Sequence, residues 1–101
     1  MRDKLGIYEN SEITVKAVYK KYATTNKNKN LLFKCIIKDN EQITDHVWIK
    51  LRNIINNFNY HETKIDVEIT GKISTYMKYD KNGNKVMDYC FKNVKIEKIQ
   101  K

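Results

Sequence analysis

Residues 13–38 read ITVKAVYKKYATTNKNKNLLFKCIIK, and this stretch decides the fold. Apolar and polar residues alternate on both sides of a polar centre, which is the period-two pattern of half-buried β-strands. The pattern predicts one strand at residues 12–22 and a second at residues 31–38, joined by a polar loop at residues 23–30. The stretch holds seven lysines and no acidic residue. Such a surface suits a phosphate backbone and its bases.

A third strand and a helix are predicted next. Turn-forming residues 39–42 end the second strand, and residues 43–51 alternate again, with Val47, Ile49 and Leu51 facing inward. From Leu51 the apolar spacing changes to that of a helix, so we expect a helix of about ten residues that includes Ile55 and Phe58. Its asparagines give it a low helix propensity, so it depends on packing.

The last third of the chain predicts a β-hairpin. Apolar residues mark a fourth strand at residues 65–73, in which Gly71 indicates a bulge or a tight bend. Asn82-Gly83 matches a type I′ turn, which requires positive φ at both central residues, and a fifth strand begins near Val86. The alternation slips further on, which indicates a bulge near Asn93.

The composition describes one folded, basic domain. The chain has 101 residues, 41% of them hydrophobic, and a net charge of +8. This charge favours a nucleic acid, an acidic protein or an anionic membrane as partner. With 18 lysines against 2 arginines, and 12 asparagines, an AT-rich coding sequence explains the overall charge equally well. Without a membrane-length apolar run or a signal-peptide core in residues 1–10, we expect a cytoplasmic protein that does not bind membranes.

Three strands, a helix and a closing hairpin form an all-β order, β-β-β-α-β-β, that resembles the OB-fold, a five-stranded Greek-key barrel. The resemblance covers residues 12–99 and rests on topology. It implies an N-terminal extension at residues 1–11 and a single OB-like domain at residues 12–101. An SH3-like barrel is the rival architecture, although it usually lacks a helix at this place.

The resemblance implies a nucleic-acid-binding face on the first three strands, flanked by two lysine-bearing loops at residues 23–30 and 79–85. The expected binding residues are Lys16, Lys20, Tyr22, Lys27, Lys29, Lys34, Lys38, His46, Trp48, Lys50, Tyr76, Tyr79 and Lys81. Lysines would neutralise phosphates, and Trp48 and Tyr22 would stack on bases. A packed Trp48 is the alternative, and a one-residue bulge in the third strand would turn it inward. The aliphatic residues Leu32 and Ile36, also expected on this face, suggest a protein partner or a cover by the N-terminal segment.

Catalytic and metal-binding motifs are missing from the sequence. There is no glycine-rich phosphate loop, nucleophile elbow or His-Glu-x-x-His helix, so we expect no enzyme and no cofactor. Cys35 and Cys90 lie in apolar strand patterns and, in a reducing cytoplasm, are expected to be buried thiols and not a disulfide. A zinc site that combines them with His46 and His61 is not expected, because the short ligand pairs of such sites are absent. Asp45 and His46 are neighbours on a strand, so we expect them to point to opposite faces.

A narrower resemblance concerns residues 44–49, Thr-Asp-His-Val-Trp-Ile, together with the Lys/Asn/Ile-rich style of the chain. These look like the small OB-type proteins of phage and cassette replication modules in low-GC Gram-positive bacteria, such as the "middle protein" of the staphylococcal cassette chromosome. This resemblance implies a DNA replication accessory protein of a mobile genetic element, with single-stranded DNA or RNA and a DNA polymerase or primase as partners. The alternatives are a protein interaction module, or an inhibitor of a host enzyme, without nucleic-acid binding.

Overall fold

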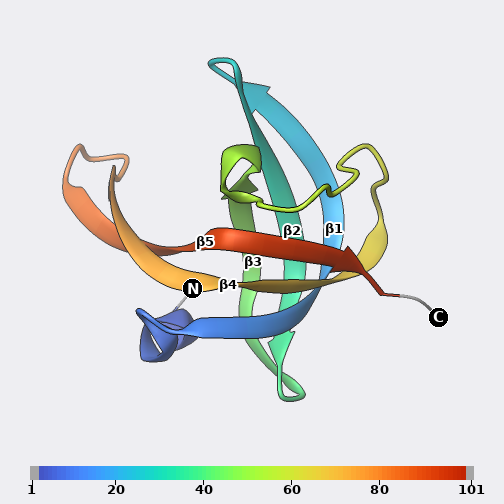
Figure 1. Ribbon diagram of the computed structural model, residues 1–101. Helices are drawn as coiled ribbons and strands as arrows, with labels where there is room; N and C mark the ends of the chain where they lie inside the picture. Colours follow the sequence, from blue (N-terminus) through green and yellow to red (C-terminus); the bar gives the residue numbers. More distant parts are fainter. Residues whose placement is uncertain (1–2, 100–101) are drawn as a thin grey trace.

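The structure is a computed structural model that describes residues 3–99, and it confirms the all-β class. Five antiparallel strands form one sheet in the order β3-β2-β1-β4-β5 (Figure 1). The strands are β1 (Glu12–Thr25), β2 (Asn28–Lys38), β3 (Glu41–Lys50), β4 (Ile65–Tyr79) and β5 (Lys85–Lys98). Two 3-10 helices, η1 (Asp3–Tyr8) and η2 (Leu51–Asn53), complete the fold.

The sheet curves around one core until its two edge strands approach each other. Ile54, just after β3 and η2, forms a parallel bridge with Val94 of β5, and Ile55 N–H donates to the Val94 carbonyl at 2.7 Å. The fully buried core side chains come from all five strands and from η1, and the largest are Tyr19, Phe33, Phe91, Leu5, Leu31, Ile36, Ile49, Ile69, Ile73 and Ile96. Leu5 therefore belongs to the core although it lies in the expected extension.

The helix predicted after residue 51 was wrong. Within residues 51–64 only η2 is helical, and residues 55–64 follow an irregular path that belongs to no helix or strand (Figure 1). Asn56 uses its side chain to accept from Ile96 N–H at 3.1 Å and to donate to Ile96 O at 2.9 Å. Tyr19 donates its hydroxyl to Tyr60 O at 2.6 Å. The Asn56 amide thus pairs with backbone groups of β5, and this pairing holds the segment in a conformation that is not a helix.

Bulges change which side chains face the core. Cys35 has a φ of 55° and interrupts the β1–β2 register, so that Ile36 turns inward and is 0% exposed. Cys35 is exposed, contrary to the predicted buried thiol. A second β1–β2 register shift, between Tyr19 and Lys21, places Tyr22 opposite the buried Leu31.

The predicted irregularity in the last hairpin is confirmed. Asn93 has a φ of 53°, and the β4–β5 register shifts between Thr70 and Lys72, so the extra residue of the bulge belongs to β5. Gly71 lies opposite this bulge, where an added Cβ would be 3.1 Å from Val94 and 3.2 Å from Phe91. The glycine therefore allows the close packing that bends the sheet.

The turn types differ from the prediction. Asn82-Gly83 does mark the β4–β5 turn, but only Gly83 has positive φ, and Gly83 N–H donates to Asp80 O, so the turn is not type I′. Positive φ at two successive residues occurs instead at Asn26-Lys27 and at Asp39-Asn40. The predicted loop at residues 23–30 is consequently reduced to Asn26 and Lys27, which lie between β1 and β2.

Candidate nucleic-acid interface

A groove lies where the free edge of β3 faces β5 and the β4–β5 hairpin. Its volume is about 350 Å³, and its lining residues are Asn30, Val47, Trp48, Lys50, Arg52, Asn53, Tyr76, Tyr89, Cys90, Phe91 and Lys92. Trp48 from β3 and Tyr76 from β4 are 41% and 39% exposed. Partly exposed rings on two sides of one groove can hold a flat aromatic ligand such as a base. We call this hollow the β3–β5 groove.

The β3–β5 groove is basic because, among residues 3–99, its cations have no carboxylate partners. Lys50, Arg52 and Lys92 are exposed, and none of them forms an ion pair with any other residue in the range 3–99. A second hollow of about 320 Å³ shares Lys50 and Arg52 with the groove and adds Lys27 and Lys29 from the β1–β2 hairpin. Five cations therefore follow one another from the hairpin tip to β5.

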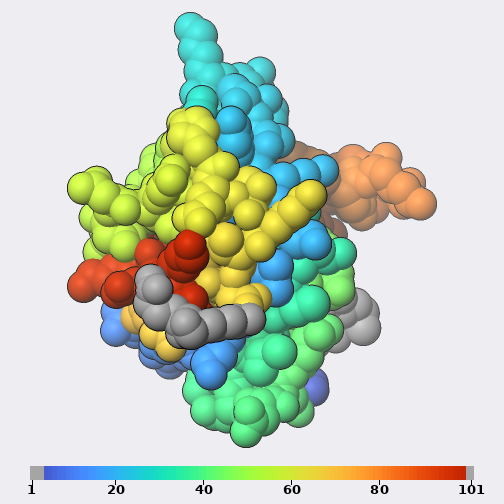
Figure 2. Space-filling model, turned by 90° about the vertical axis from the view of Figure 1, so that its right-hand side faces the viewer, coloured from blue at the N-terminus to red at the C-terminus, as the bar shows by residue number. Residues whose placement is uncertain are grey.

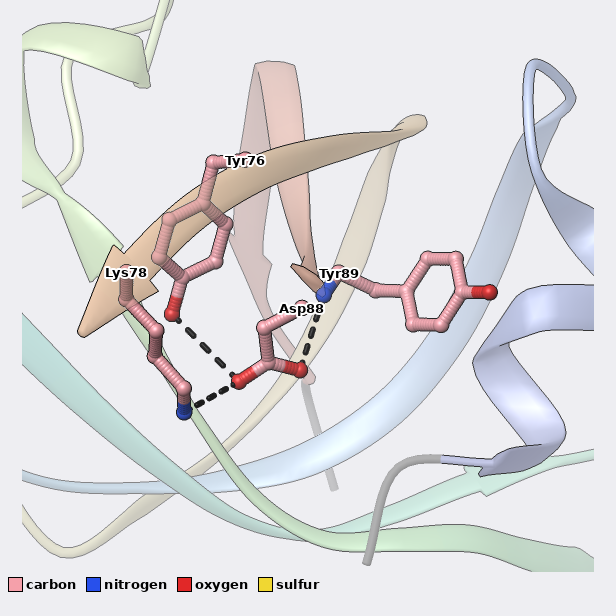
Figure 3. A network of polar contacts seen from close by, with 4 residues as sticks. All are labelled: Tyr76, Lys78, Asp88 and Tyr89. Carbon is pink, nitrogen blue, oxygen red and sulfur yellow. Dashed lines mark hydrogen bonds and ion pairs between the residues drawn. The ribbon is translucent and has the colours of Figure 1, made fainter. Parts of the chain in front are cut away.

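A carboxylate fixes the aromatic side of the groove. Asp88 Oδ2 accepts from Lys78 Nζ at 2.7 Å and from Tyr76 Oη at 3.5 Å, while its Oδ1 accepts from Tyr89 N–H at 2.8 Å (Figure 3). The Asp88 side chain is only 13% exposed. Its charge is thus compensated within the hairpin, and Tyr76 is held in one orientation beside the groove.

Cys90 lines the groove but shows no sign of a nucleophile. Burial raises the pKa of its thiol, Asp88 acts in the same direction, and Lys92 and Lys50 oppose them. A thiol with a raised pKa stays protonated at neutral pH and is a weak nucleophile. Among residues 3–99, no group of three or more His, Cys, Asp or Glu side chains is placed to hold a metal ion.

The structure brings together five of the predicted binding residues and separates others. Lys27, Lys29, Trp48, Lys50 and Tyr76 line the two connected hollows. Lys16 and Lys38 lie in a different hollow of about 230 Å³, together with Asp39 and Glu68. Lys38 donates to Asp39 at 2.9 Å, and this hydrogen bond raises the pKa of Lys38. These two lysines therefore lie beside carboxylates. Neither carboxylate belongs to the first three predicted strands, so the predicted binding face did not include them.

Asp45 compensates a second part of the predicted face. Lys34 lies 3.8 Å from the Asp45 carboxylate, and His46 Nδ1 lies 3.2 Å from it. The expectation that Asp45 and His46 point apart was wrong, because the side chains meet beside the strand. Lys20 is exposed on β1, and it lines neither of the two connected hollows.

Three further predicted positions need correction. Ile36 cannot bind a partner because the bulge at Cys35 buries it. Tyr22 does not share the face of Trp48, since its ring packs against Tyr60 at 4.9 Å between centroids. Leu32 does remain on the outer face, half-buried and directly opposite Trp48 in the β2–β3 register.

The hairpin residues Tyr79 and Lys81 also lie apart from the groove. Tyr79 is opposite Lys85, on the other face of the hairpin from Tyr76, and Lys81 is in the turn at its tip. Tyr76 and Tyr79 are three positions apart on β4. Because successive side chains of a strand alternate between its two faces, an odd separation places them on opposite faces.

Arg52, Lys92 and Asn30 were missed by the sequence analysis. Arg52 falls in the segment for which a helix was predicted, where it had no neighbours on the strands, and Lys92 lies on β5 beside a bulge whose register the sequence does not fix. The OB-type order alone gave one available signal, because it places the third and fifth strands side by side.

Comparisons with known proteins give no relative for this chain: no family model, no curated protein and no solved structure matches it. In the part of the chain that the structure describes, no helix is long and apolar enough to cross a membrane.

Proposed function

We propose that this protein is an OB-type module that binds single-stranded nucleic acid in the β3–β5 groove. The observation that carries the proposal is the combination of Trp48 and Tyr76 with Lys50, Arg52 and Lys92 in one groove. Stacking platforms beside unpaired cations are what a single strand requires, because every base offers a flat face and every linkage carries a negative charge.

The strand order supports the OB-type part of the proposal. The order β3-β2-β1-β4-β5, with a parallel bridge between Ile54 and Val94, brings the chain after the third strand beside the fifth, as in a Greek-key barrel. Residues 54–64 occupy the place where such folds carry a helix, and the two hairpins flank the groove.

In this proposal the protein recognises the charge and the base faces of the nucleic acid and reads little of its sequence. Lys27, Lys29, Lys50, Arg52 and Lys92 would each meet a phosphate. The shared side chains Lys50 and Arg52 make the two hollows one path, so the strand would run from the β1–β2 hairpin into the groove and stack there on Trp48. A role as a DNA replication accessory subunit rests on the resemblance of residues 44–49 and of the composition, and binding of this kind is compatible with it.

Fluorescence anisotropy of labelled oligo-dT tests the proposal, with the emission of Trp48 followed in the same titration. We expect micromolar or tighter binding, quenching of Trp48, and a slope of log affinity against log salt of about −3.5 if all five cations meet phosphates. Absence of binding at low salt, or binding that leaves Trp48 emission unchanged, would overturn the proposal.

A further inference from the structure

The β4–β5 hairpin extends well beyond the rest of the sheet. The register of β1 with β4 ends at Glu12 opposite Lys72, whereas β4 continues to Tyr79 and β5 begins at Lys85. Residues 74–90 therefore form a two-stranded arm, which projects from the body in Figure 1 and in Figure 2. A two-stranded ribbon in water is marginally stable unless something packs on its apolar face.

The two faces of the arm differ in chemistry. Tyr76, Lys78 and Asp88 occupy the face that borders the β3–β5 groove. The other face, which we call the inner face, continues the core: the buried pair Ile73 and Phe91 is followed in register by Thr75 with Tyr89, Met77 with Met87, and Tyr79 with Lys85. Figure 3 shows Tyr89 pointing away from the Asp88 network.

The cover of the inner face stops at Tyr89. Its hydroxyl lies against η1, so close that a Cβ on Gly6 would be 2.8 Å away. Beyond it Met77 and Met87, directly opposite each other, are 57% and 59% exposed, and Tyr79 is 69% exposed. Methionine side chains adapt to irregular apolar surfaces and are common where a protein binds peptides.

The charges around the inner face favour an acidic occupant. Asp80 accepts the backbone N–H groups of Asn82 and Asn84, and Asp88 holds Lys78, so both carboxylates are used within the arm. Lys81 and Lys85 are exposed and form no ion pair within residues 3–99. A second copy of the chain would bring another net charge of +8 against these lysines.

We propose that the inner face of the arm docks an extended, acidic segment of a protein partner through apolar side chains that pack on Met77, Met87 and Tyr79. Lys81 and Lys85 pair with the carboxylates of that segment. Met77, Met87 and Tyr79 do not line the β3–β5 groove, which the inner face enters only through Tyr89 and Phe91 nearer the core, so the docking site is separate from the proposed nucleic-acid site. The partner and the nucleic acid can therefore be bound at the same time.

Selection from a displayed random-peptide library on the full-length protein tests this proposal. The double variant Met77→Ser/Met87→Ser, in excess, serves as the competitor that removes peptides bound elsewhere. We expect enriched peptides that are acidic and contain apolar residues, and whose synthetic forms lose about tenfold in affinity on the double variant. Lys81→Gln/Lys85→Gln should weaken them less and reduce their salt dependence.

Matched controls keep the test decisive. Ile55→Ser removes an exposed aliphatic side chain on residues 54–64 and should leave peptide binding unchanged. All substituted residues are exposed, so the variants should keep the wild-type circular dichroism spectrum and melting temperature.

Three results would overturn the proposal. The first is a selection that enriches no peptide, or only neutral or basic ones. The second is a concentration-dependent dimer in sedimentation that Met77→Ser/Met87→Ser abolishes, because the occupant would then be a second copy. The third is loss of oligo-dT affinity in the same variant, which would assign the inner face to the nucleic acid.

Discussion

Two lysine-bearing hollows of this protein differ in what stands beside their lysines. In the β3–β5 groove, Lys50 and Lys92 have no carboxylate partner in the described chain and lie next to Trp48. The other hollow, which we call the β1–β2 hollow, holds Lys16 and Lys38 together with Asp39 and Glu68. Its lining includes no aromatic residue, although Lys38 Nζ lies 5.4 Å from the centre of the Tyr8 ring.

The difference teaches that lysine number alone does not locate an anion site. Lys16 and Lys38 belong to the stretch free of acidic residues, yet the fold brings Glu68 of β4 opposite Lys16 and the turn brings Asp39 to Lys38. Lys38 forms an ion pair with Asp39, and Lys16 shares its hollow with Glu68. A lysine beside a carboxylate presents little net charge at a distance, whereas a cation without one attracts phosphate. The account therefore assigns binding to the groove and little to the β1–β2 hollow.

Removing the aromatic platform should have the largest effect. Trp48→Ala should lower oligo-dT affinity by about 1 to 3 kcal/mol, because one base loses its stacking partner. Anisotropy titrations at fixed salt measure the loss. Trp48→Phe should keep part of the affinity, and Tyr79→Ala, an exposed aromatic outside the groove, should match the wild type; an equal loss in Tyr79→Ala would break the comparison.

Charge removal should separate the two hollows next. Lys50→Gln/Arg52→Gln should reduce the magnitude of the salt slope by about 1.4, since two phosphate contacts disappear. Lys16→Gln/Lys38→Gln removes the same number of charges from the β1–β2 hollow. This control should leave the slope nearly unchanged, and similar slopes in both variants would show that binding follows net charge only.

The attachment of residues 54–64 to the sheet is sensitive to high pH through Tyr19, which donates to Tyr60 O. Burial, with Tyr22 and Tyr60 acting in the same direction, raises the pKa of Tyr19 to about 12. A tyrosine has a pKa of about 10 when unfolded, so the stability from the neutral phenol is complete below pH 10 and is lost as pH rises through 12.

Tyr19→Phe should cost about 1 kcal/mol in urea unfolding at pH 8, because the hydrogen bond to Tyr60 O disappears. The gap to the wild type should narrow at pH 11, and a constant gap would contradict this assignment. Residues 54–64 line neither the groove nor the β1–β2 hollow, so oligo-dT affinity of the folded variant should match the wild type.

The smallest effect is expected from neutralising the two carboxylates that lie beside Lys16 and Lys38 in the β1–β2 hollow. Asp39→Asn/Glu68→Gln should raise oligo-dT affinity by no more than about threefold at low salt, because it strengthens the basic field without adding a stacking platform. The same anisotropy assay measures it. A gain as large as the loss in Trp48→Ala would mean that the β1–β2 hollow can replace the groove.

Alternation predicted the strands of this fold well, because half-buried strands leave a strong period-two pattern. The bulge near Asn93 was also predicted, since it shifts that pattern visibly. The bulge at Cys35 was not, because Leu31 to Ile37 are nearly all apolar and fit either register. The helix was predicted wrongly for a related reason: three apolar residues at helical spacing also suit an irregular segment that packs over the sheet.

Part of the candidate site could be predicted, and part could not. Trp48 and Lys50 were recognisable because β3 keeps its alternation through them. Glu68, Asp39 and Asp45, which lie beside Lys16, Lys38 and Lys34, became visible as their neighbours only in the folded sheet and its turns. Pairing of charges across strands depends on register, which sequence periodicity does not fix.

The most direct test of the central claim is a titration of the ¹⁵N-labelled protein with oligo-dT, followed by two-dimensional NMR. The account predicts that the largest shifts occur at the Trp48 indole N–H and at the amides of Lys50, Arg52 and Lys92. Amides of the β1–β2 hollow, such as those of Lys16 and Lys38, should move little. Equal shifts in both hollows, or shifts centred on Lys16 and Lys38, would contradict the account.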